Sequence, residues 1–294
     1  MTHINRTASS EAAPSSYASD PNIRILHRVA TLEDFPLMEQ AHPSVRRVII
    51  VDTETTGTDP LVDEIIDIAF VTIDVDARGE IIDIVSRGQG LRDPGVPIPA
   101  QISRLTGLTD ADVEGKVIDL DRLEQALVRA DVRIAHNASF DIAFLENLMP
   151  GLAGAAWACS ARDFDWLAEG FDGRKLGHLL MQIGWFNGAH RAMADVISLL
   201  HLLAHRLDDG NTVIGKLLDR AERPSIRFEA NGAPFSRRSL LKGRGYHWDP
   251  RQRVWWIEIA QDECAEEERW FRTEIAPHGP APRMLPITWN QRHR

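Results

Sequence analysis

The chain has 294 residues, with 33 lysines and arginines against 43 aspartates and glutamates, and a formal net charge of −10. This length allows one large or two modest domains with a real core. The negative total argues against a protein that coats polyanions with its whole surface. No window reaches 18 apolar residues, and no basic start precedes an apolar run, so we expect no membrane contact and no secretion.

The two cysteines, Cys159 and Cys264, have no CxxC or Cys/His ligand spacing. Reduced thiols in a cytoplasmic protein are the default expectation for such a pair. Residues 1–22 are rich in Ser, Ala, Thr and Pro and are predicted to form a disordered leader. Residues 23–44 are an N-terminal extension, with a short helix predicted around residues 32–40 and Thr31 as its cap.

The stretch from Val48 to Gly57 reads VIIVDTETTG. Its first four residues are apolar and all four are β-branched, which predicts a strand buried on both faces. Asp52 and Glu54 follow at i, i+2, so in a continuing strand they project from the same face, ~7 Å apart. Two acids at a buried strand end suit a shared metal site. The alternative is a solvated strand end that enters a Thr-Thr-Gly turn.

The next elements follow in chain order. Strands are predicted at residues 64–75 and 80–87, joined by Asp76-Ala77-Arg78-Gly79, and the short Gly-containing connection favours an antiparallel meander with the first strand. A loop at 94–99, a short helix at 100–105, a Thr109-x-x-Asp start and a helix at 119–130 come next. A strand at 132–135 completes this part.

Two further segments carry acids at helix starts. Asp141 falls in the first turn of a helix that follows the strand at 132–135, where α/β sheets bind their ligands, although such an Asp often only complements the helix dipole. Residues 157–184 are read as helix and connection, with 175–183 amphipathic. In the third segment, 188–203, Asp195 lies one turn inside a strong helix. His190 stands before it on the loop or first turn, because five residues give roughly 500° of helical rotation.

Together these residues resemble the three motifs of the DnaQ-like (DEDDh) 3′-5′ exonuclease family: Asp52 and Glu54 in DTETTG, Asp141 in HNASFD, and His190 and Asp195 in HRAMAD. The similarity runs from about Val48 to Leu203. It implies an α/β, RNase H-like fold, a mixed five-stranded sheet flanked by helices, with two Mg²⁺ or Mn²⁺ ions and release of nucleoside 5′-monophosphates. Many relatives have His where this chain has Thr106, which puts any substrate contact at that position in doubt.

The chemistry of the residues agrees with this resemblance. Two metals about 3.5–4 Å apart stabilise both the attacking and the leaving oxygen of a phosphodiester, and all-oxygen ligands select Mg²⁺ or Mn²⁺ over zinc. By family inference, Asp52 bridges both ions, Glu54 and Asp195 hold the ion near the nucleophile, and Asp141 supports the other through water. An imidazole, with an ordinary pKa of about 6.5, suits His190 for taking a proton from the attacking water.

Substrate contacts are expected around the metal face. Candidates are Thr55, Thr56 and Gly57, where Gly57 would permit close approach of a nucleotide, together with Thr106, His136 and Asn137. The alternative for His136 and Asn137 is that their side chains satisfy loop backbone.

Beyond Leu207 the composition changes. Residues 45–208 are predicted as the exonuclease domain, 209–223 as a helical linker, and 224–294 as a small α+β C-terminal module with a strand, a short helix and a WDPRQRVWW hairpin. Between residues 224 and 259 there are seven Lys or Arg and three Asp or Glu. Basic residues among tryptophans suit a nucleic-acid strand, whereas tryptophan in so small a module more often fills the core. The candidate contacts are Arg237, Arg238, Lys242, Arg244, Arg251 and Arg253.

The sequence therefore predicts a divalent-metal-dependent 3′-5′ exonuclease that acts on DNA 3′ ends, single-stranded or frayed, in proofreading or repair, with a polymerase or repair protein as a partner. The alternatives are an exoribonuclease of the ribonuclease T type and, in another class, a non-catalytic nucleic-acid-binding scaffold.

Overall fold

The computed structural model describes residues 20, 22–37, 45–188 and 190–294, and the predicted leader lies almost wholly outside them. A central five-stranded sheet organises the molecule, in the order β4-β3-β2-β5-β6. Its β2–β3 and β3–β4 pairs are antiparallel and its β2–β5 and β5–β6 pairs are parallel. The strands are β2 (Val45–Thr55), β3 (Ile65–Asp76), β4 (Ile81–Leu91), β5 (Val132–Ala135) and β6 (Trp157–Cys159). The predicted meander and mixed sheet are confirmed.

Strand β2 is central because both of its faces are apolar. Val48 and Ile50 belong to one core cluster and Ile49 and Val51 to another, and all four are fully buried. Burial of each such side chain contributes roughly 1.5–3 kcal/mol. The strand thus joins two hydrophobic layers, which fixes the face from which every following side chain projects.

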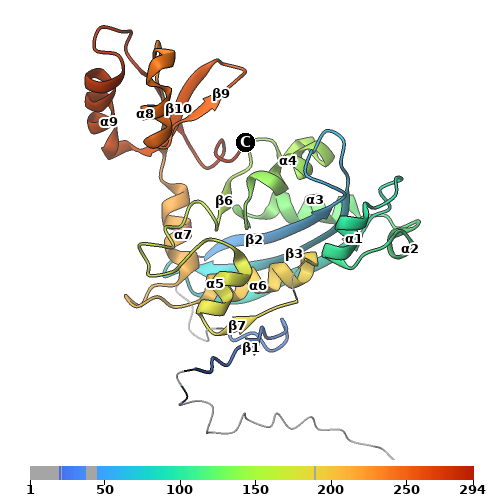
Figure 1. Ribbon diagram of the computed structural model, residues 1–294. Helices are drawn as coiled ribbons and strands as arrows, with labels where there is room; N and C mark the ends of the chain where they lie inside the picture. Colours follow the sequence, from blue (N-terminus) through green and yellow to red (C-terminus); the bar gives the residue numbers. More distant parts are fainter. Residues whose placement is uncertain (1–19, 21, 38–44, 189) are drawn as a thin grey trace, which may run out of the picture.

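Helices cover the two faces of this sheet (Figure 1). On the Val48 and Ile50 face the core includes apolar residues of α5, α6 and α7, and on the other face it includes residues of α3 and α4. The helices of this part are α1 (Ala100–Thr106), α2 (Asp110–Val113), α3 (Leu120–Arg129), α4 (Ser139–Leu148), α5 (Leu176–Gln182), α6 (Ala192–Ala204) and α7 (Val213–Glu222). None of the helices in the described ranges is long and apolar enough to cross a bilayer.

Helix starts follow the capping signals in the sequence. Thr109 and Asp112 form a capping box at α2, and Thr212 accepts the backbone N–H of Gly215 at the start of α7. Such caps satisfy donors that a helix leaves free at its first turn. Helix α7, inside the predicted helical linker, buries Ile214 and Leu217 in the core on the Val48 and Ile50 face of the sheet. The domain boundaries themselves remain predictions.

Two local predictions are wrong. Residues 32–37 form a bend and a turn followed by a segment without regular secondary structure instead of a helix, while residues 38–40 lie outside the described ranges. The physical reason is tertiary: Leu32 and Phe35 are both buried in the core on the Val48 and Ile50 face of the sheet, and this packing overrides the local helix signal. Residues 157–159 form the edge strand β6 instead of helix, because they pair with β5.

The N-terminal extension pairs with the layered part of the chain. Strand β1 (His27–Arg28) pairs in parallel with β7 (Trp185–Phe186). The backbone carbonyl of Ala30 bonds to His201 Nε2 of α6 at 3.2 Å. These contacts place the extension against β7 and α6.

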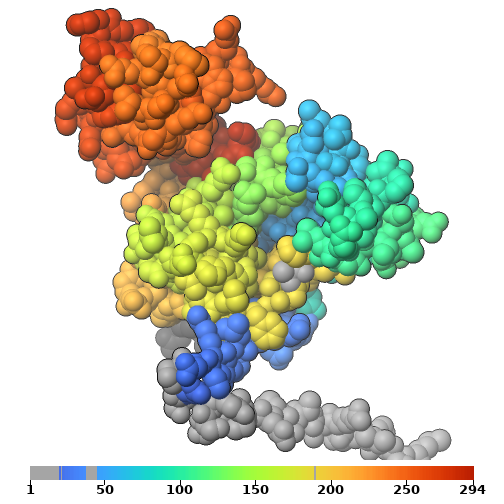
Figure 2. All heavy atoms as spheres, viewed as in Figure 1, coloured from blue at the N-terminus to red at the C-terminus, as the bar shows by residue number. Residues whose placement is uncertain are grey.

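The C-terminal module forms a lobe that projects from the layered part (Figure 2). Its antiparallel sheet has the order β11-β8-β10-β9, and Phe228, Leu241, Tyr246, Phe271 and Ile275 fill its core. The predicted strand, short helix and hairpin are confirmed. The elements are β8 (Ser225–Glu229), α8 (Arg238–Gly243), β9 (His247–Asp249), β10 (Val254–Ala260), α9 (Cys264–Trp270), a π-helical turn (Phe271–Ile275) and β11 (Arg283–Ile287).

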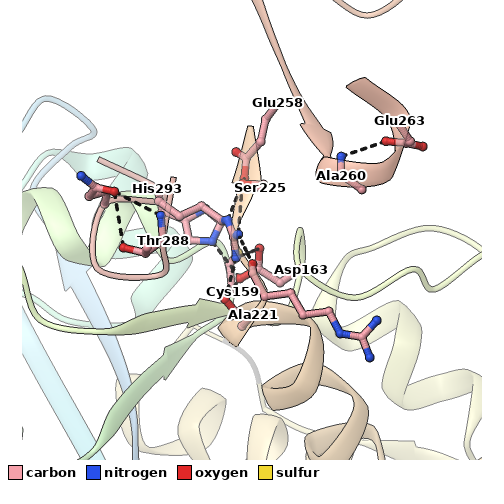
Figure 3. Close-up of polar contacts among 12 residues, drawn as sticks. Cys159, Asp163, Ala221, Ser225, Glu258, Ala260, Glu263, Thr288 and His293 are labelled. Atoms are coloured by element: carbon pink, nitrogen blue, oxygen red, sulfur yellow. Dashed lines mark hydrogen bonds and ion pairs between the residues drawn. The ribbon is translucent and has the colours of Figure 1, made fainter. Parts of the chain in front are cut away.

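The last seven residues return from the module to the layered part of the chain. The backbone N–H of Trp157 donates to the Trp289 carbonyl at 3.1 Å. His293 Nε2 lies 2.8 Å from Asp163 Oδ2, and both side chains are buried (Figure 3). The buried Arg292 guanidinium donates to the Ala221 carbonyl at the end of α7 and to Glu258 of β10. The module is therefore held to the layers both by α7 and by its own C-terminus.

Candidate active site

The carboxyl end of β2 carries two of the predicted ligands. The strand continues to Thr55, so Asp52 and Glu54 lie on the same face as Val48 and Ile50, toward α6. Thr53, between them, points to the other face, toward α4. The predicted geometry of the two acids is therefore present.

Helix α6 supplies the third carboxylate. Asp195 lies in its first turn, and one carboxylate oxygen from each of Asp52, Glu54 and Asp195 lies within 4.8 Å of the other two. Helix α6 packs on β2 and β3 through buried residues such as Val196 and Leu199. Its packing therefore sets the position of Asp195 against the strand.

Asp141 reaches the same strand end from the opposite layer. It lies in the first turn of α4, as predicted, and is almost fully buried. Thr53 Oγ1 donates to Asp141 Oδ1 at 2.8 Å, so this carboxylate stands apart from the cluster of three. Its charge is still close enough to raise the pKa of Asp52.

Burial and repulsion between carboxylates both act on the four acids. Loss of hydration on burial raises the pKa of Asp52 well above its ordinary range, and the charges of Asp141, Asp195 and Glu54 raise it further. Burial, followed by the Asp195 charge, raises the pKa of Glu54 to about 7, and burial raises the pKa of Asp141 and of Asp195. No ion pair in the described part of the chain involves any of them. Their mutual repulsion favours a bound cation.

His190 lies at the edge of this cluster. Its side chain is exposed and its backbone has φ 66°, outside helix α6 as predicted. Its backbone N–H donates to Asp195 Oδ2 at 2.8 Å. The left-handed conformation is uncommon for a residue with a β-carbon, and the bond to Asp195 stabilises it. The imidazole is thereby tied to a predicted metal ligand while it stays open to solvent.

Sequence reasoning missed an anchor for the His190 loop. Arg191 Nε donates to Asp67 Oδ2 at 3.0 Å, and Gln89 Nε2 donates to Asp67 Oδ1 at 3.1 Å. Asp67 is fully buried on β3, directly opposite Glu54 in the register. The signal was present as a lone acid in the apolar run IIDIAFV, because an unpaired charge is not tolerated in such a strand.

Asn187 is a second missed residue. Its side-chain amide donates to Asp195 Oδ1 at 3.1 Å and to Ser198 Oγ at 2.6 Å. Asp195 therefore receives one bond on each oxygen, which fixes the orientation of the carboxylate. The only sequence signal for Asn187 is that it lies a few residues before the predicted helix that carries Asp195.

The residues next to β2 that are predicted to contact substrate have their polar groups bonded to other protein atoms. The Thr55 hydroxyl bonds to the Gly57 carbonyl, and Thr56 Oγ1 donates to Asp63 Oδ1 at 3.1 Å. A β-carbon on Gly57 would lie 2.4 Å from Asp63 Oδ2. The fit against Asp63 therefore explains this glycine without any nucleotide. Nucleotide contacts by Thr55, Thr56 and Gly57 remain predictions.

The other three substrate candidates are placed differently. Thr106 is buried, and its hydroxyl donates to the Ile102 carbonyl and accepts from the Leu108 N–H. His136 has both ring nitrogens at 2.8 Å from protein atoms, Ser160 Oγ and the Arg174 carbonyl, and burial lowers its pKa. Asn137 is exposed in the turn before α4, with φ 75°. Of the three, only Asn137 is exposed.

Five of the six basic candidates in the C-terminal module are exposed: Arg237, Arg238, Lys242, Arg251 and Arg253. Arg244 differs, because its Nε donates to Glu267 Oε2 at 2.8 Å and its guanidinium lies over the Trp270 ring. Its charge is therefore paired with a carboxylate inside the module.

Comparison with known proteins places this geometry in a family. The family model described as Exonuclease matches residues 49–203, a range that contains all five residues of the predicted catalytic set. The chain belongs to the DnaQ-like exonuclease family. The predicted RNase H-like α/β fold is confirmed with it, by the mixed sheet and its flanking helices.

Curated relatives of this exonuclease are DNA polymerases III of the PolC type. The Bacillus subtilis protein is 37% identical over 99 residues, which is 33% of this chain and 6% of the relative. The Thermotoga maritima protein is 35% identical over 111 residues, 37% of this chain and 8% of the relative. The exonuclease thus spans less than a tenth of the length of these relatives.

Solved structures similar to this exonuclease include exonuclease X in complex with 5′ overhanging duplex DNA and E. coli exonuclease I in complex with a dA16 oligonucleotide. The first has a TM-score of 0.43 and 24% identity, over 59% of this chain and 99% of that one. The second has a TM-score of 0.47 and 16% identity, over 84% of this chain and 64% of that one.

Proposed function

We propose that this exonuclease hydrolyses phosphodiester bonds at the 3′ end of DNA, single-stranded or frayed, and releases nucleoside 5′-monophosphates in proofreading or repair. The observation that carries the proposal is the convergence of Asp52, Glu54 and Asp195 within 4.8 Å, with His190 bonded to Asp195. Hydrolysis of a charged ester needs a cation site and a nearby base, and this cluster offers both.

The residues fit divalent cations with oxygen ligands. All ligand atoms in the cluster are carboxylate oxygens, which suit Mg²⁺ or Mn²⁺. Burial, and then repulsion between the carboxylates, raises the pKa of Asp52 and of Glu54, and a bound cation would offset both effects. Asp52, Glu54 and Asp195 would hold one ion, and Asp52 with Asp141 a second. Bound ions would stabilise negative charge on the oxygens of the reacting phosphate.

The protein's own contribution is to position the base and the ligands. His190 would accept the proton of the attacking water, because its imidazole is solvent-exposed and bonded through its backbone to Asp195. Asn187 and Arg191 would hold Asp195 and the loop in place through their bonds to Asp195 and Asp67. Such pre-organisation lowers the cost of reaching the reactive geometry.

The choice of DNA as the substrate is supported by the relatives named DNA polymerase III, which match part of this chain at 37% identity. A polymerase or repair protein is then the proposed partner. Thr106, whose hydroxyl is satisfied within α1 and the turn that follows it, gives no support to a substrate contact at that position.

The test measures release of mononucleotides from 3′-labelled and 5′-labelled oligonucleotides of DNA and of RNA, with Mg²⁺, with Mn²⁺ and with EDTA. We expect Mg²⁺-dependent release of the label as mononucleotide from 3′-labelled DNA first, and stepwise shortening of 5′-labelled DNA. Asp52→Ala is the control and should be inactive. Activity that survives Asp52→Ala, or faster release from RNA than from DNA, would contradict the proposal.

A further inference from the structure

One surface of the C-terminal module carries two cations beside three aromatic rings. It lies along α8 with its preceding turn and continues onto the β9–β10 hairpin, which lies beside α8 on the side away from α9 in Figure 1. We call it the stacking surface, and it consists of Phe235, Arg238, Lys242, Trp248 and Trp255.

The helical part of this surface follows one side of α8. Phe235, Arg238 and Lys242 are spaced i, i+3 and i+7, which places them on a common side. All three are exposed, Phe235 by 77%. The Arg238 guanidinium lies 4.2 Å from the centre of the Phe235 ring. Leu240, by contrast, points to the other side of the same helix.

The β9–β10 hairpin carries the rest of the stacking surface. Trp248 and Trp255 are directly opposite in the β9–β10 register, so their rings project from one face of the sheet. Their centroids are 5.5 Å apart, and Lys242 Nζ lies 5.9 Å from the Trp255 centroid. Trp248 is 47% exposed, which is unusual for a tryptophan in a module that has few large side chains to bury.

The charges of the surface are not neutralised by the protein. Within the described part of the chain no carboxylate forms an ion pair with Arg238 or Lys242, whereas Arg227 pairs with Glu229 and Asp249, and Arg244 with Glu267. The module therefore separates cations that complete its own structure from cations that face solvent beside aromatic rings.

We infer that the stacking surface binds single-stranded nucleic acid, with bases stacked on Trp248 and Phe235 and phosphates contacted by Arg238 and Lys242. Rings supply faces for bases of any sequence, and unpaired cations supply the backbone contacts, which is the pattern of sequence-tolerant single-strand binding. The inference rests on the proposed function, because it makes the module a second contact for the same strand.

The attachment of the module makes this second contact effective. Helix α7 and the C-terminal segment, through Arg292 and His293, both hold the module to the exonuclease layers. A fixed second site raises the effective concentration of a strand that is long enough to reach both sites. A short substrate gains nothing from it.

The first experiment measures binding of fluorescein-labelled (dT)20 to the full chain in EDTA by anisotropy, over a range of salt concentrations. Trp248→Ala and Phe235→Ala should each weaken binding about tenfold. Lys242→Gln should lower the slope of log K against log salt by about 0.7. Leu240→Ala on the opposite side of α8, and Arg272→Gln on the π-helical turn, are matched controls and should bind as the wild type does.

The second experiment separates this inference from the proposed function. Hydrolysis of the p-nitrophenyl ester of thymidine 5′-monophosphate reports on the active site alone, so Trp248→Ala and Lys242→Gln should hydrolyse it at the wild-type rate while KM for (dT)20 rises. Failure of the wild type to cleave the ester or any oligonucleotide would refute the proposed function and leave the binding result intact. Unchanged (dT)20 affinity and salt slope in Trp248→Ala, Phe235→Ala and Lys242→Gln would overturn the inference, and a protein would then be the occupant to seek.

Discussion

Acidic side chains with little solvent exposure are paired with cations in one part of this molecule and unpaired in the other. In the C-terminal module, Glu229 is paired with Arg227, and Glu267 accepts bonds from Arg244 and from the Tyr246 hydroxyl. At the end of β2, Asp52 and Glu54 have carboxylates for neighbours and no paired cation among the described residues.

This difference separates acids that stabilise the fold from acids that are proposed to bind metal ions for catalysis. An ion pair in a small core offsets its own desolvation through hydrogen bonds, whereas a cluster of like charges destabilises the protein until a cation binds. Removing one charge should therefore have opposite effects in the two parts. The predictions below test this contrast, beginning with catalysis itself.

The largest effect is expected for His190→Ala. Loss of a general base lowers turnover by about 10²- to 10⁴-fold, and turnover on 3′-labelled DNA measures it. Mn²⁺ binding, followed by calorimetry, should be nearly unchanged because no His190 side-chain atom belongs to the carboxylate cluster. A variant with the wild-type rate would remove His190 from the mechanism.

The contrast itself is tested by two charge removals in EDTA at pH 7.5. Glu267→Gln should destabilise the protein by about 1–3 kcal/mol, because Arg244 and Tyr246 lose a charged partner. Glu54→Gln should raise the melting temperature by roughly 5 °C, because it removes a repelling charge. Thermal unfolding measures both. Destabilisation by Glu54→Gln in the absence of metal would break the contrast.

The third prediction concerns pH. The folded protein holds the pKa of Glu54 at about 7, above its ordinary 4.5, so between these values the folded state binds more protons than the unfolded state. The stability from this group is therefore present below about pH 4.5 and is lost as the pH rises toward 7.

The measurement is the melting temperature of the metal-free protein at pH 5.5 and at pH 7.5. We expect the melting temperature to be a few degrees higher at pH 5.5 than at pH 7.5. Saturating Mn²⁺ should reduce the difference, since a cation replaces the protons. Asp93, an exposed acid whose pKa is lowered by backbone N–H groups, offers a control: Asp93→Asn should leave the pH dependence between these two values unchanged.

The smallest effect is expected for the anchor of the His190 loop. Arg191→Ala should reduce kcat about tenfold, through a less well positioned loop, with little change in KM. Arg191→Lys should restore part of the rate because it keeps the charge next to Asp67. A change in KM alone, with kcat preserved, would argue that Arg191 contacts substrate instead of positioning the loop.

The sequence predicts those site residues whose position follows from a local pattern, and it misses those whose role depends on contacts with distant segments. Asp52 and Glu54 are fixed by alternation along one strand, and Asp141 and Asp195 by first-turn positions after strands and loops, so local pattern and motif sufficed to place them on their elements. Asp67, Gln89 and Asn187 were missed because their roles arise from contacts between segments far apart in the chain or between a loop and a helix.

By itself the sequence determined the meander, the starts of α2, α3 and α7, the motif residues and the hairpin of the C-terminal module, since each depends on hydrophobic period, caps or turn chemistry over a few residues. Only the tertiary structure decided that residues 32–37 would pack on the core without a helix, and that residues 157–159 would complete the sheet. It also decided that Arg292 and His293 would hold the C-terminal segment to the layers. It also decided which charges are paired. Pairing depends on which side chains meet after folding, and a local sequence pattern carries no information on that meeting.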